Sequence, residues 1–252
     1  VCTAAAASAS YSATLPVVGV MFAASDSIHL YATAGRGFET PTLNELAYRP
    51  DGSAGLNTDL RPAKSDNYEI GAKTEWLDNR MRFNISVYTM QWDDFAVQVE
   101  DPQSGVFQLG YVNLPSAEIK GVEAEFELAP VEGLRLRLAG SYVDAKYKDF
   151  LESAINPSTG QRLDSSDNRM QRTPETQVSG GIDYTMALGS WGDALNFRVN
   201  YTWQSDMYWA TDNIASEDSY GLLDARIGLS PEGAPWQVAI WGRNVTDELY
   251  RT

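Results

Sequence analysis

Apolar and polar residues alternate along this sequence with a period of two, and this alternation restricts its possible folds more than any other feature. Between Asn67 and Leu77, every second residue from Tyr68 to Trp76 is aromatic, aliphatic or threonine, and the residues between them are polar or glycine. Successive side chains of a β-strand point to opposite faces, so this segment is predicted to be a strand with one apolar face. The alternation recurs in residues 81–87, 122–128, 134–138, 195–204 and 223–229, and more weakly in 17–24, 28–38, 178–188 and 236–243. The sequence therefore predicts about ten strands.

The connections between these strands alternate between short and long. The short ones are Ser25–Ser27, Asp78–Arg80, Ala129–Gly133, Gly189–Ala194 and Ser230–Pro235. The long ones are Glu39–Lys64, Asp93–Ala117, Asp144–Pro174 and Ser205–Tyr220. Outer-membrane barrels have this layout, with tight turns in the periplasm and long loops outside the cell. A soluble β-sandwich has no reason to sort its loops in this way, so we predict antiparallel transmembrane strands.

The composition agrees with a membrane barrel and argues against two other classes. The longest apolar run, Ala13–Ala24, contains Pro16 and Gly19 and is shorter than the roughly 20 residues that a transmembrane helix needs. The net charge of −15 argues against a nucleic-acid partner, because phosphate binding requires clustered lysine and arginine. Several aromatic residues lie near predicted strand ends, where their rings would suit the two headgroup levels of a membrane. They are Tyr31, Tyr68, Trp76, Tyr142, Tyr184, Trp203 and Trp236.

The hairpin around Ala129–Gly133 allows a prediction of its register. If Leu128 faces Leu134, then Glu127 lies opposite Arg135, and the next polar pair toward the loops is Glu125 with Arg137. Directly opposed pairs of opposite charge stabilise a sheet by roughly 0.2–1 kcal/mol each. The apolar and the charged residues thus favour the same register.

Few residues in the sequence suit catalysis or metal binding. Cys2 is the single cysteine and His29 the single histidine, so we expect no disulfide, no metal site and no cofactor. His29 follows a short turn and is expected at the periplasmic end, whereas membrane-embedded hydrolases use a histidine on the outer side. The acidic pairs Asp93–Asp94 and Glu217–Asp218 fall in long loops, where solvated charge is the ordinary interpretation and calcium or lipopolysaccharide bridging the alternative. We therefore expect no enzyme.

Four segments resemble the C-terminal barrel of TonB-dependent outer-membrane receptors, in the same order and with similar spacing, over about residues 15 to 252. The first two are YATAGRGFETP at 31–41 and LRPAKSDNYEIGAK at 60–73. The others are IKGVEAE at 119–125 and WGRNVTDELY at 241–250. Each motif alone is a weak signal, but four in order are a strong one.

The resemblance implies an all-β fold in which about ten antiparallel transmembrane strands form an arc of a 22-stranded outer-membrane barrel. It implies energised uptake of a scarce nutrient, a ferric siderophore first, with haem, cobalamin or a glycan as alternatives. The implied partners are the protein's own N-terminal plug domain, TonB, a small-molecule metal chelate, and outer-membrane lipid with lipopolysaccharide. We expect residues 1–252 to be one partial barrel domain without plug or last strand, with residues 1–14 a loop or a disordered start.

Aromatic residues beside arginines in the long loops suit an anionic, partly aromatic chelate. The candidate ligand-binding residues are Tyr48, Arg49, Arg169, Arg172, Met207, Tyr208 and Trp209. A second set should line the lumen, as polar wall or as contacts to the plug: Glu123, Glu125, Glu127, Arg135, Arg137, Asp183, Arg198 and Arg226. A passive porin-like or adhesive barrel, which needs no plug, stays the alternative function.

Overall fold

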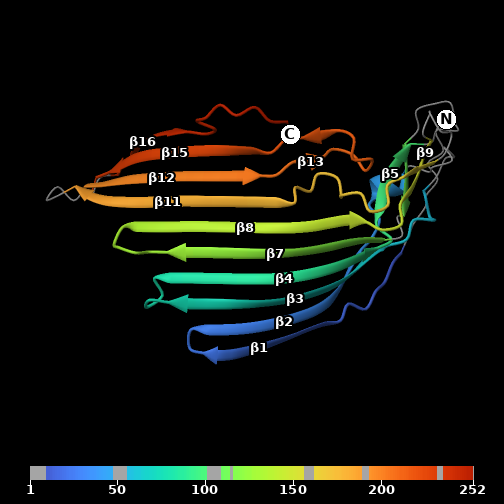
Figure 1. Ribbon diagram of the computed structural model, residues 1–252, viewed down its shortest axis with the longest axis horizontal. Helices are drawn as coiled ribbons and strands as arrows, with labels where there is room; N and C mark the ends of the chain where they lie inside the picture. Colours follow the sequence, from blue (N-terminus) through green and yellow to red (C-terminus); the bar gives the residue numbers. More distant parts are fainter. Residues whose placement is uncertain are drawn as a thin grey trace.

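A ten-stranded antiparallel sheet makes up most of the computed structural model, which describes residues 10–47, 56–100, 109–113, 116–155, 162–188, 193–231 and 235–251. Its strands are β1 (Val17–Ser25), β2 (Ile28–Glu39), β3 (Ala63–Trp76), β4 (Met81–Asp93), β7 (Ser116–Leu128), β8 (Leu134–Tyr147), β11 (Thr176–Leu188), β12 (Asp193–Gln204), β15 (Tyr220–Ser230) and β16 (Val238–Gly242). They lie side by side in chain order and form an open arc (Figure 1). Both predictions, all-β fold and about ten strands, are confirmed.

The long connections carry secondary structure that the sequence patterns did not reveal. Within the described residues, three hairpins stand outside the main sheet: β5 (Ala96–Glu100) with β6 (Leu109–Asn113), β9 (Leu151–Ile155) with β10 (Arg162–Asp164), and β13 (Met207–Tyr208) with β14 (Ser216–Glu217). A single helical turn, α1 (Leu43–Leu46), begins at Thr42 with a capping box to Glu45. All of these elements lie at the same end of the sheet, opposite the tight turns (Figure 1). In the described parts of the chain, no helix is long and apolar enough to cross a membrane.

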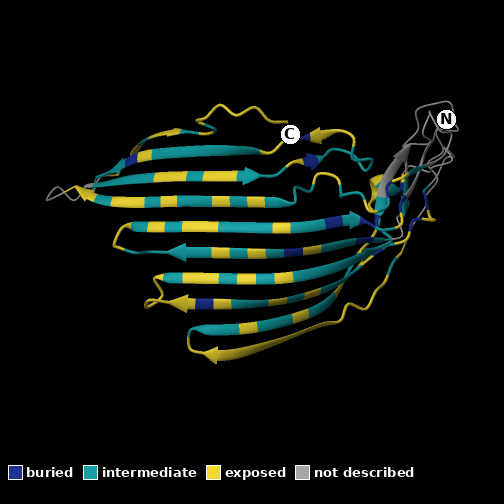
Figure 2. Ribbon diagram, viewed as in Figure 1, coloured by how far each residue is buried: buried dark blue, intermediate teal, exposed yellow. Residues whose placement is uncertain are grey.

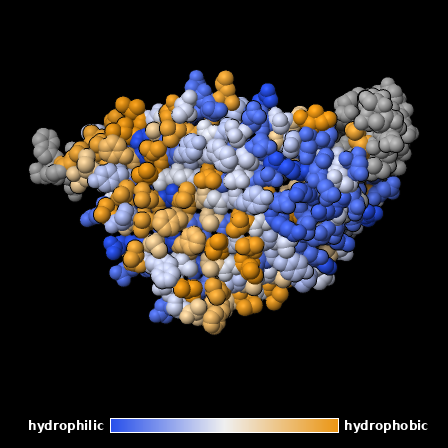
Figure 3. Space-filling model, viewed as in Figure 1, coloured by the Kyte–Doolittle hydropathy of each residue, from blue (hydrophilic) through white to orange (hydrophobic). Residues whose placement is uncertain are grey.

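One face of the sheet is covered with exposed hydrophobic side chains. Residues in register form apolar rows across the strands, such as Val20, Ala32, Ile70, Val87, Val122 and Tyr142. Val20 and Ile70 are each 62% exposed, and Val87 is 50% exposed. Exposed residues alternate along the strands (Figure 2), and hydrophobic residues gather over the strands while hydrophilic ones gather at the loop end (Figure 3). A soluble sandwich would bury these rows, so this is the face of a barrel wall that contacts lipid.

The opposite face is polar and has aromatic rings packed over glycines. The Tyr31 ring lies over Gly71, and the Tyr31 hydroxyl donates a hydrogen bond to Glu69. Tyr88 covers Gly121 in the same way. The prediction that Tyr31 anchors the chain at a membrane headgroup level is therefore wrong. Tyr31 belongs to the polar set of β2, whose apolar positions are the even-numbered residues such as Leu30.

The β7–β8 hairpin has the predicted faces but a register shifted by two residues. Leu128 pairs with Leu136, and Glu127 pairs with Arg137. The shift arises because Leu134 begins β8 by pairing with Tyr184 of β11, beyond the end of β7. Arg135 is consequently not opposite Glu127, although its side chain still reaches that carboxylate diagonally at 3.3 Å. The predicted pairs of Glu127 with Arg135 and of Glu125 with Arg137 are thus wrong as directly opposed pairs.

The turn of this hairpin depends on a glycine. Gly133 has a φ of +79°, a conformation that L side chains rarely adopt, and a Cβ there would collide with the Thr185 carbonyl oxygen. The Gly133 carbonyl accepts a hydrogen bond from the Thr185 N–H at 2.8 Å. The turn is thereby tied to β11, which helps to fix where β8 begins.

The sheet ends in two strands that each have one neighbour. β1 pairs with β2, and β16 pairs with β15, and the described parts of β1 and β16 do not pair with each other. For ten strands taken from a larger barrel, with unpaired edges near Val17 and Arg243, we predict either an open curved sheet or a forced closure into a ten-stranded barrel, and the open form is the one observed. Unpaired backbone groups are costly in lipid, so this arc matches part of a larger wall.

Candidate functional site

Two long loops meet at the loop end of the sheet and are joined by hydrogen bonds between their backbones and side chains. The Arg169 N–H donates to Asn213 Oδ1 at 2.9 Å, and Asn213 Nδ2 donates to the Arg169 carbonyl at 3.0 Å. The Arg172 N–H donates to the Tyr208 carbonyl at 2.7 Å. Arg172 and Asn213 both adopt positive φ angles, of 56° and 54°. These contacts place the loop that follows β10 against the β13–β14 hairpin.

Two arginine–aromatic pairs result from this docking. The Arg169 guanidinium lies over the Tyr208 ring at 5.2 Å from its centroid, and the Arg172 guanidinium lies over the Trp209 ring at 5.8 Å. Both distances are within the range of a cation–π interaction. The structure therefore brings together four of the loop residues that the sequence singles out.

The two arginines are available to a ligand to different degrees. Arg169 is mostly buried, with 16% of its side chain exposed, and it forms ion pairs with Asp206 at 2.8 Å and with Glu175 at 3.5 Å. Its charge is thus already balanced within the loops. Arg172 is exposed and has no ion pair with any residue that the structure describes. Arg172 is therefore the guanidinium of this cluster that can accept an anionic group from solution.

The remaining predicted loop residues have different positions. Met207 is buried, with 8% exposure, and pairs with Glu217 in the β13–β14 hairpin, so it supports the loop from within. Trp209 Nε1 is buried and has no hydrogen-bond acceptor among the described residues. Tyr48 and Arg49 lie outside the described residues.

An aromatic cluster beneath the loops was not recognised from the sequence. Trp92 stacks on Phe95 at 4.9 Å between ring centroids, and Phe95 lies 6.2 Å from Tyr147. Tyr147 in turn contacts the edge of Phe150 at 5.2 Å. Tyr147 and Phe150 are almost fully buried. One signal in the sequence could have revealed this cluster. At the ends of β4 and β8, an aromatic residue is followed three positions later by a second one, as in Trp92 with Phe95 and Tyr147 with Phe150. It anchors the roots of two loops and offers no surface to a ligand.

The predicted lumen residues share the polar face of the sheet. Asp183 accepts hydrogen bonds from both Arg137 and Arg198. Glu125 accepts one from Asn84 at 3.3 Å, and Glu127 is paired with Arg135. Glu123 is in register with Ser86 and Ser141 on the same face. Most of these side chains satisfy one another, which makes the face a hydrogen-bonded polar wall.

Arg226 differs from the other lumen residues. It is directly opposite Arg198 in the β12–β15 pairing, and it forms no ion pair with a carboxylate in the described parts of the chain. Within the same parts, no group of three or more histidine, cysteine, aspartate or glutamate side chains is placed to hold a metal ion.

Comparison with known proteins agrees with this geometry. The family model described as TonB dependent receptor-like, beta-barrel matches residues 2–245. The chain belongs to this family. It is part of a barrel of the bacterial outer membrane, and the proteins of its family that it matches are transport receptors and not enzymes.

The matched relatives are much longer than this chain. It is 28% identical over 240 residues to the ferric-pyoverdine M114 receptor PbuA of Pseudomonas sp. strain M114, covering 93% of this chain and 26% of the receptor. It is 29% identical over 193 residues to the vitamin B12 transporter BtuB of Vibrio vulnificus, covering 68% of this chain and 30% of the transporter. The ferric yersiniabactin uptake receptor FyuA from Yersinia pestis has a similar structure, with a TM-score of 0.67 and 20% identity over 94% of this chain and 32% of FyuA. The chain thus spans about a quarter to a third of the length of these relatives.

Proposed function

We propose that the complete protein is a receptor for TonB-coupled uptake of a ferric siderophore, and that the Arg172–Trp209 pair forms part of its extracellular binding surface. The observation that carries the proposal is the position of Arg172, an exposed guanidinium over an indole ring at the loop end of the wall. Its charge has no carboxylate partner among the described residues. A ferric siderophore complex that is anionic and partly aromatic matches both groups, by charge and by stacking.

The proposal extends to the architecture of the complete protein. An N-terminal plug domain would fill the lumen and face the polar wall, and TonB would supply the energy that moves the plug. The relatives include receptors named for ferric pyoverdine and for ferric yersiniabactin and a transporter named for vitamin B12. Ferric siderophores come first because two of these three names specify one, and cobalamin is the second substrate to test.

The test uses the complete receptor in a strain that lacks its own siderophore receptors. Binding and growth are measured with a panel of ferric catecholates, ferric hydroxamates and mixed chelates, and with cobalamin and haem. We expect Arg172→Gln to weaken binding of the accepted chelate roughly 10-fold, equivalent to about 1.4 kcal/mol. Lys148→Gln is the matched control, since it removes one positive charge from the same loop, where Lys148 is already paired with Glu118 and Asp167.

Three outcomes would contradict the proposal. The first is that no iron chelate of the panel binds or supports growth. The second is that uptake is unchanged in a strain without TonB. The third is a large, immediate conductance in a planar bilayer, which is the behaviour of a passive porin-like barrel. Equal loss of affinity in the Arg172→Gln and Lys148→Gln variants would leave the transport function standing and would refute the assigned site.

A further inference from the structure

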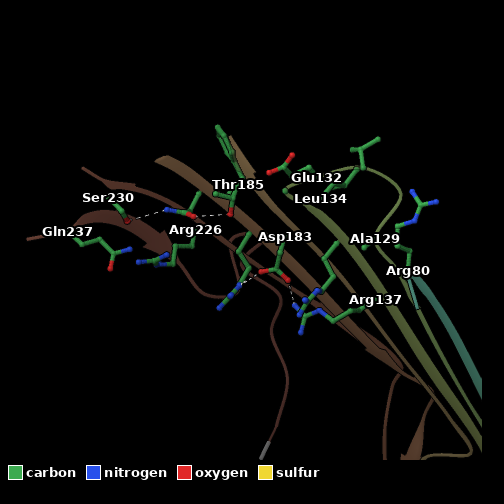
Figure 4. Close-up of a pocket in the computed structure, with 16 residues that line it drawn as sticks. Arg80, Ala129, Glu132, Leu134, Arg137, Asp183, Thr185, Arg226, Ser230 and Gln237 are labelled. Carbon is green, nitrogen blue, oxygen red and sulfur yellow. Dashed lines mark hydrogen bonds and ion pairs between the residues drawn. The ribbon is translucent and has the colours of Figure 1, made fainter. Parts of the chain in front are cut away.

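The turn end of the polar face contains a cavity that is rich in arginine. Its volume is about 810 Å³, and it is formed by β8, β11, β12 and β15 with residues of the β3–β4 and β7–β8 turns (Figure 4). Its charged lining consists of Arg80, Arg135, Arg137, Arg198, Arg226, Glu132 and Asp183. Among the lining residues that the structure describes, five cations thus face two anions, whereas the whole chain has a net charge of −15. Positive charge is therefore concentrated in this cavity, although the chain as a whole is negatively charged.

The internal ion pairs do not neutralise this cluster. Asp183 is shared between Arg137 and Arg198, so one carboxylate serves two guanidinium groups. Arg135 is paired with Glu127 at the margin of the cavity, at 3.3 Å. With that carboxylate included, the described part of the chain places five positive charges against three negative ones. Arg226 has no carboxylate partner in the described parts of the chain.

The register of the strands adds electrostatic repulsion between two of these arginines. Arg198 and Arg226 are directly opposite each other on β12 and β15. Directly opposed like charges destabilise a pair of strands, and the shared Asp183 lies on the far side of Arg198, on β11. The Arg226 guanidinium is folded back over Gly228: a Cβ added at Gly228 would lie 3.3 Å from one of its nitrogen atoms. An anionic group held in the cavity would offset the repulsion between Arg198 and Arg226.

We propose that this cavity is the docking site for an acidic segment of the N-terminal plug, and that Arg198 and Arg226 bind its carboxylates. The inference rests on the proposed function, because it requires a plug in the lumen. The cavity lies on the polar face of the sheet, opposite the apolar rows, so membrane lipid does not reach it. Its volume exceeds what one phosphate ion fills and is sufficient for several side chains. Charge complementarity selects aspartate and glutamate.

Site-specific photo-crosslinking in the complete receptor tests this docking. A photoreactive amino acid at Thr185, which lines the cavity, is compared with the same residue at Tyr184, the next position in β11, which is in the apolar set. We expect the Thr185 variant to crosslink to a plug peptide that contains at least two acidic residues, and the Tyr184 variant to give no plug crosslink. A plug peptide without acidic residues would overturn the proposal, and so would a crosslink to a different polypeptide or no crosslink at all.

Charge reversal provides a second, independent measurement. We expect Arg226→Glu to make the plug dissociate at a lower urea concentration and to raise the conductance of the receptor in a planar bilayer. Lys73→Glu is the matched control, because it reverses one charge on the same polar face outside the cavity lining, where the residues opposite Lys73 are His29 and Asn84 and neither is a carboxylate. Reversal of one acidic residue in the crosslinked peptide should restore the Arg226→Glu variant. An equal effect of both reversals, or a failure of this restoration, would refute the site.

The two proposals can fail separately. Chelate binding and growth report on the transport function, whereas the crosslink reports only on what occupies the cavity. A receptor that accepts none of the chelates but crosslinks an acidic plug peptide would refute the siderophore assignment and support the docking site. A receptor that transports a chelate but gives no such crosslink would support the siderophore assignment and refute the docking site.

Discussion

The assignment of the two faces can be tested with one strand, β4, and three arginine substitutions. Ile85→Arg places a charge in the apolar rows, where Ile85 is in register with Ala72 and Ala124. Thr89→Arg places the same charge on the same face but nearer the loops. Ser86→Arg places it on the opposite, polar face, next to Ile85 in the chain. The three variants have the same new side chain on one strand and differ in face and depth.

The expected magnitude follows from the position of Ile85 within the apolar band. Ile85 is four residues from Met81, at the turn end of β4, and four residues from Thr89. With a rise of about 3.4 Å per residue and a tilt of about 40°, four residues cover roughly 10 Å of depth. An apolar band about 25 Å tall therefore has its midplane close to Ile85.

Arginine on the lipid face costs about 2–4 kcal/mol at the midplane and about 0–1 kcal/mol near the interfaces. We thus expect Ile85→Arg to reduce the folding equilibrium constant roughly 30- to 700-fold, since each 1.4 kcal/mol is a factor of ten. Thr89→Arg should reduce it less than about fivefold, because the charge is near the headgroups. Ser86→Arg should have a similarly small effect, because its side chain faces the polar lumen.

The assay is reversible urea unfolding of the complete receptor in lipid vesicles, followed by tryptophan fluorescence and by the shift of the folded band in gel electrophoresis. The order of the three free energies is the decisive result. Equal destabilisation by Ile85→Arg and Ser86→Arg would show that the two faces do not differ in environment. A cost for Thr89→Arg as large as that for Ile85→Arg would refute the assigned depth.

Two further predictions concern packing and ionisation. Gly121→Val should destabilise the sheet by about 1–3 kcal/mol, because an added Cβ would lie 2.5 Å from the Tyr88 ring. Gly140→Ala is the control and should change the urea midpoint little, because the atom nearest to its added Cβ would be 3.7 Å away. Equal shifts of the urea midpoint in the two variants would refute the argument. The pKa of Asp164, the last residue of β10, lies below its ordinary value because the Ser166 hydroxyl and N–H hydrogen-bond to its carboxylate. This lowered pKa stabilises the loop above the pKa of the unfolded chain, and the stabilisation is lost as the pH falls through the folded value. Ser166→Ala should raise the pKa of Asp164, measured by carboxyl carbon NMR, and an unchanged titration would contradict the assignment.

Much of the fold could be predicted from the sequence because strand periodicity is a local property. Alternating side chains identify both the strands and their faces, as the 67–77 segment shows, and loop lengths identify the two ends of the barrel wall. The lumen residues Glu125, Asp183 and Arg198 were assigned to the polar face for the same reason, and they lie there. The grouping of arginine with aromatic residues in the loops was also visible in the sequence.

The sequence did not predict the hairpins within the long loops or the aromatic cluster that anchors them. β5, β9 and β13 are short segments whose partners lie in the same loop, and such short runs carry little periodic signal. The contact between Arg172 and Trp209 depends on two loops separated by two complete strands. Only the folded wall brings these loops to the same end, because adjacent antiparallel strands return the chain there.

The sequence by itself determined the class of fold, the two faces of each strand and the sorting of short turns from long loops, because each is encoded in the order of neighbouring residues. The tertiary structure decided the register. A shift of two residues keeps every side chain on its face, so alternation could not distinguish Arg135 from Arg137 as the partner of Glu127. The pairing of Leu134 with Tyr184 on β11 decided it. The same pairing of strands set Arg198 opposite Arg226, and so created the unbalanced charge at the turn end of the wall.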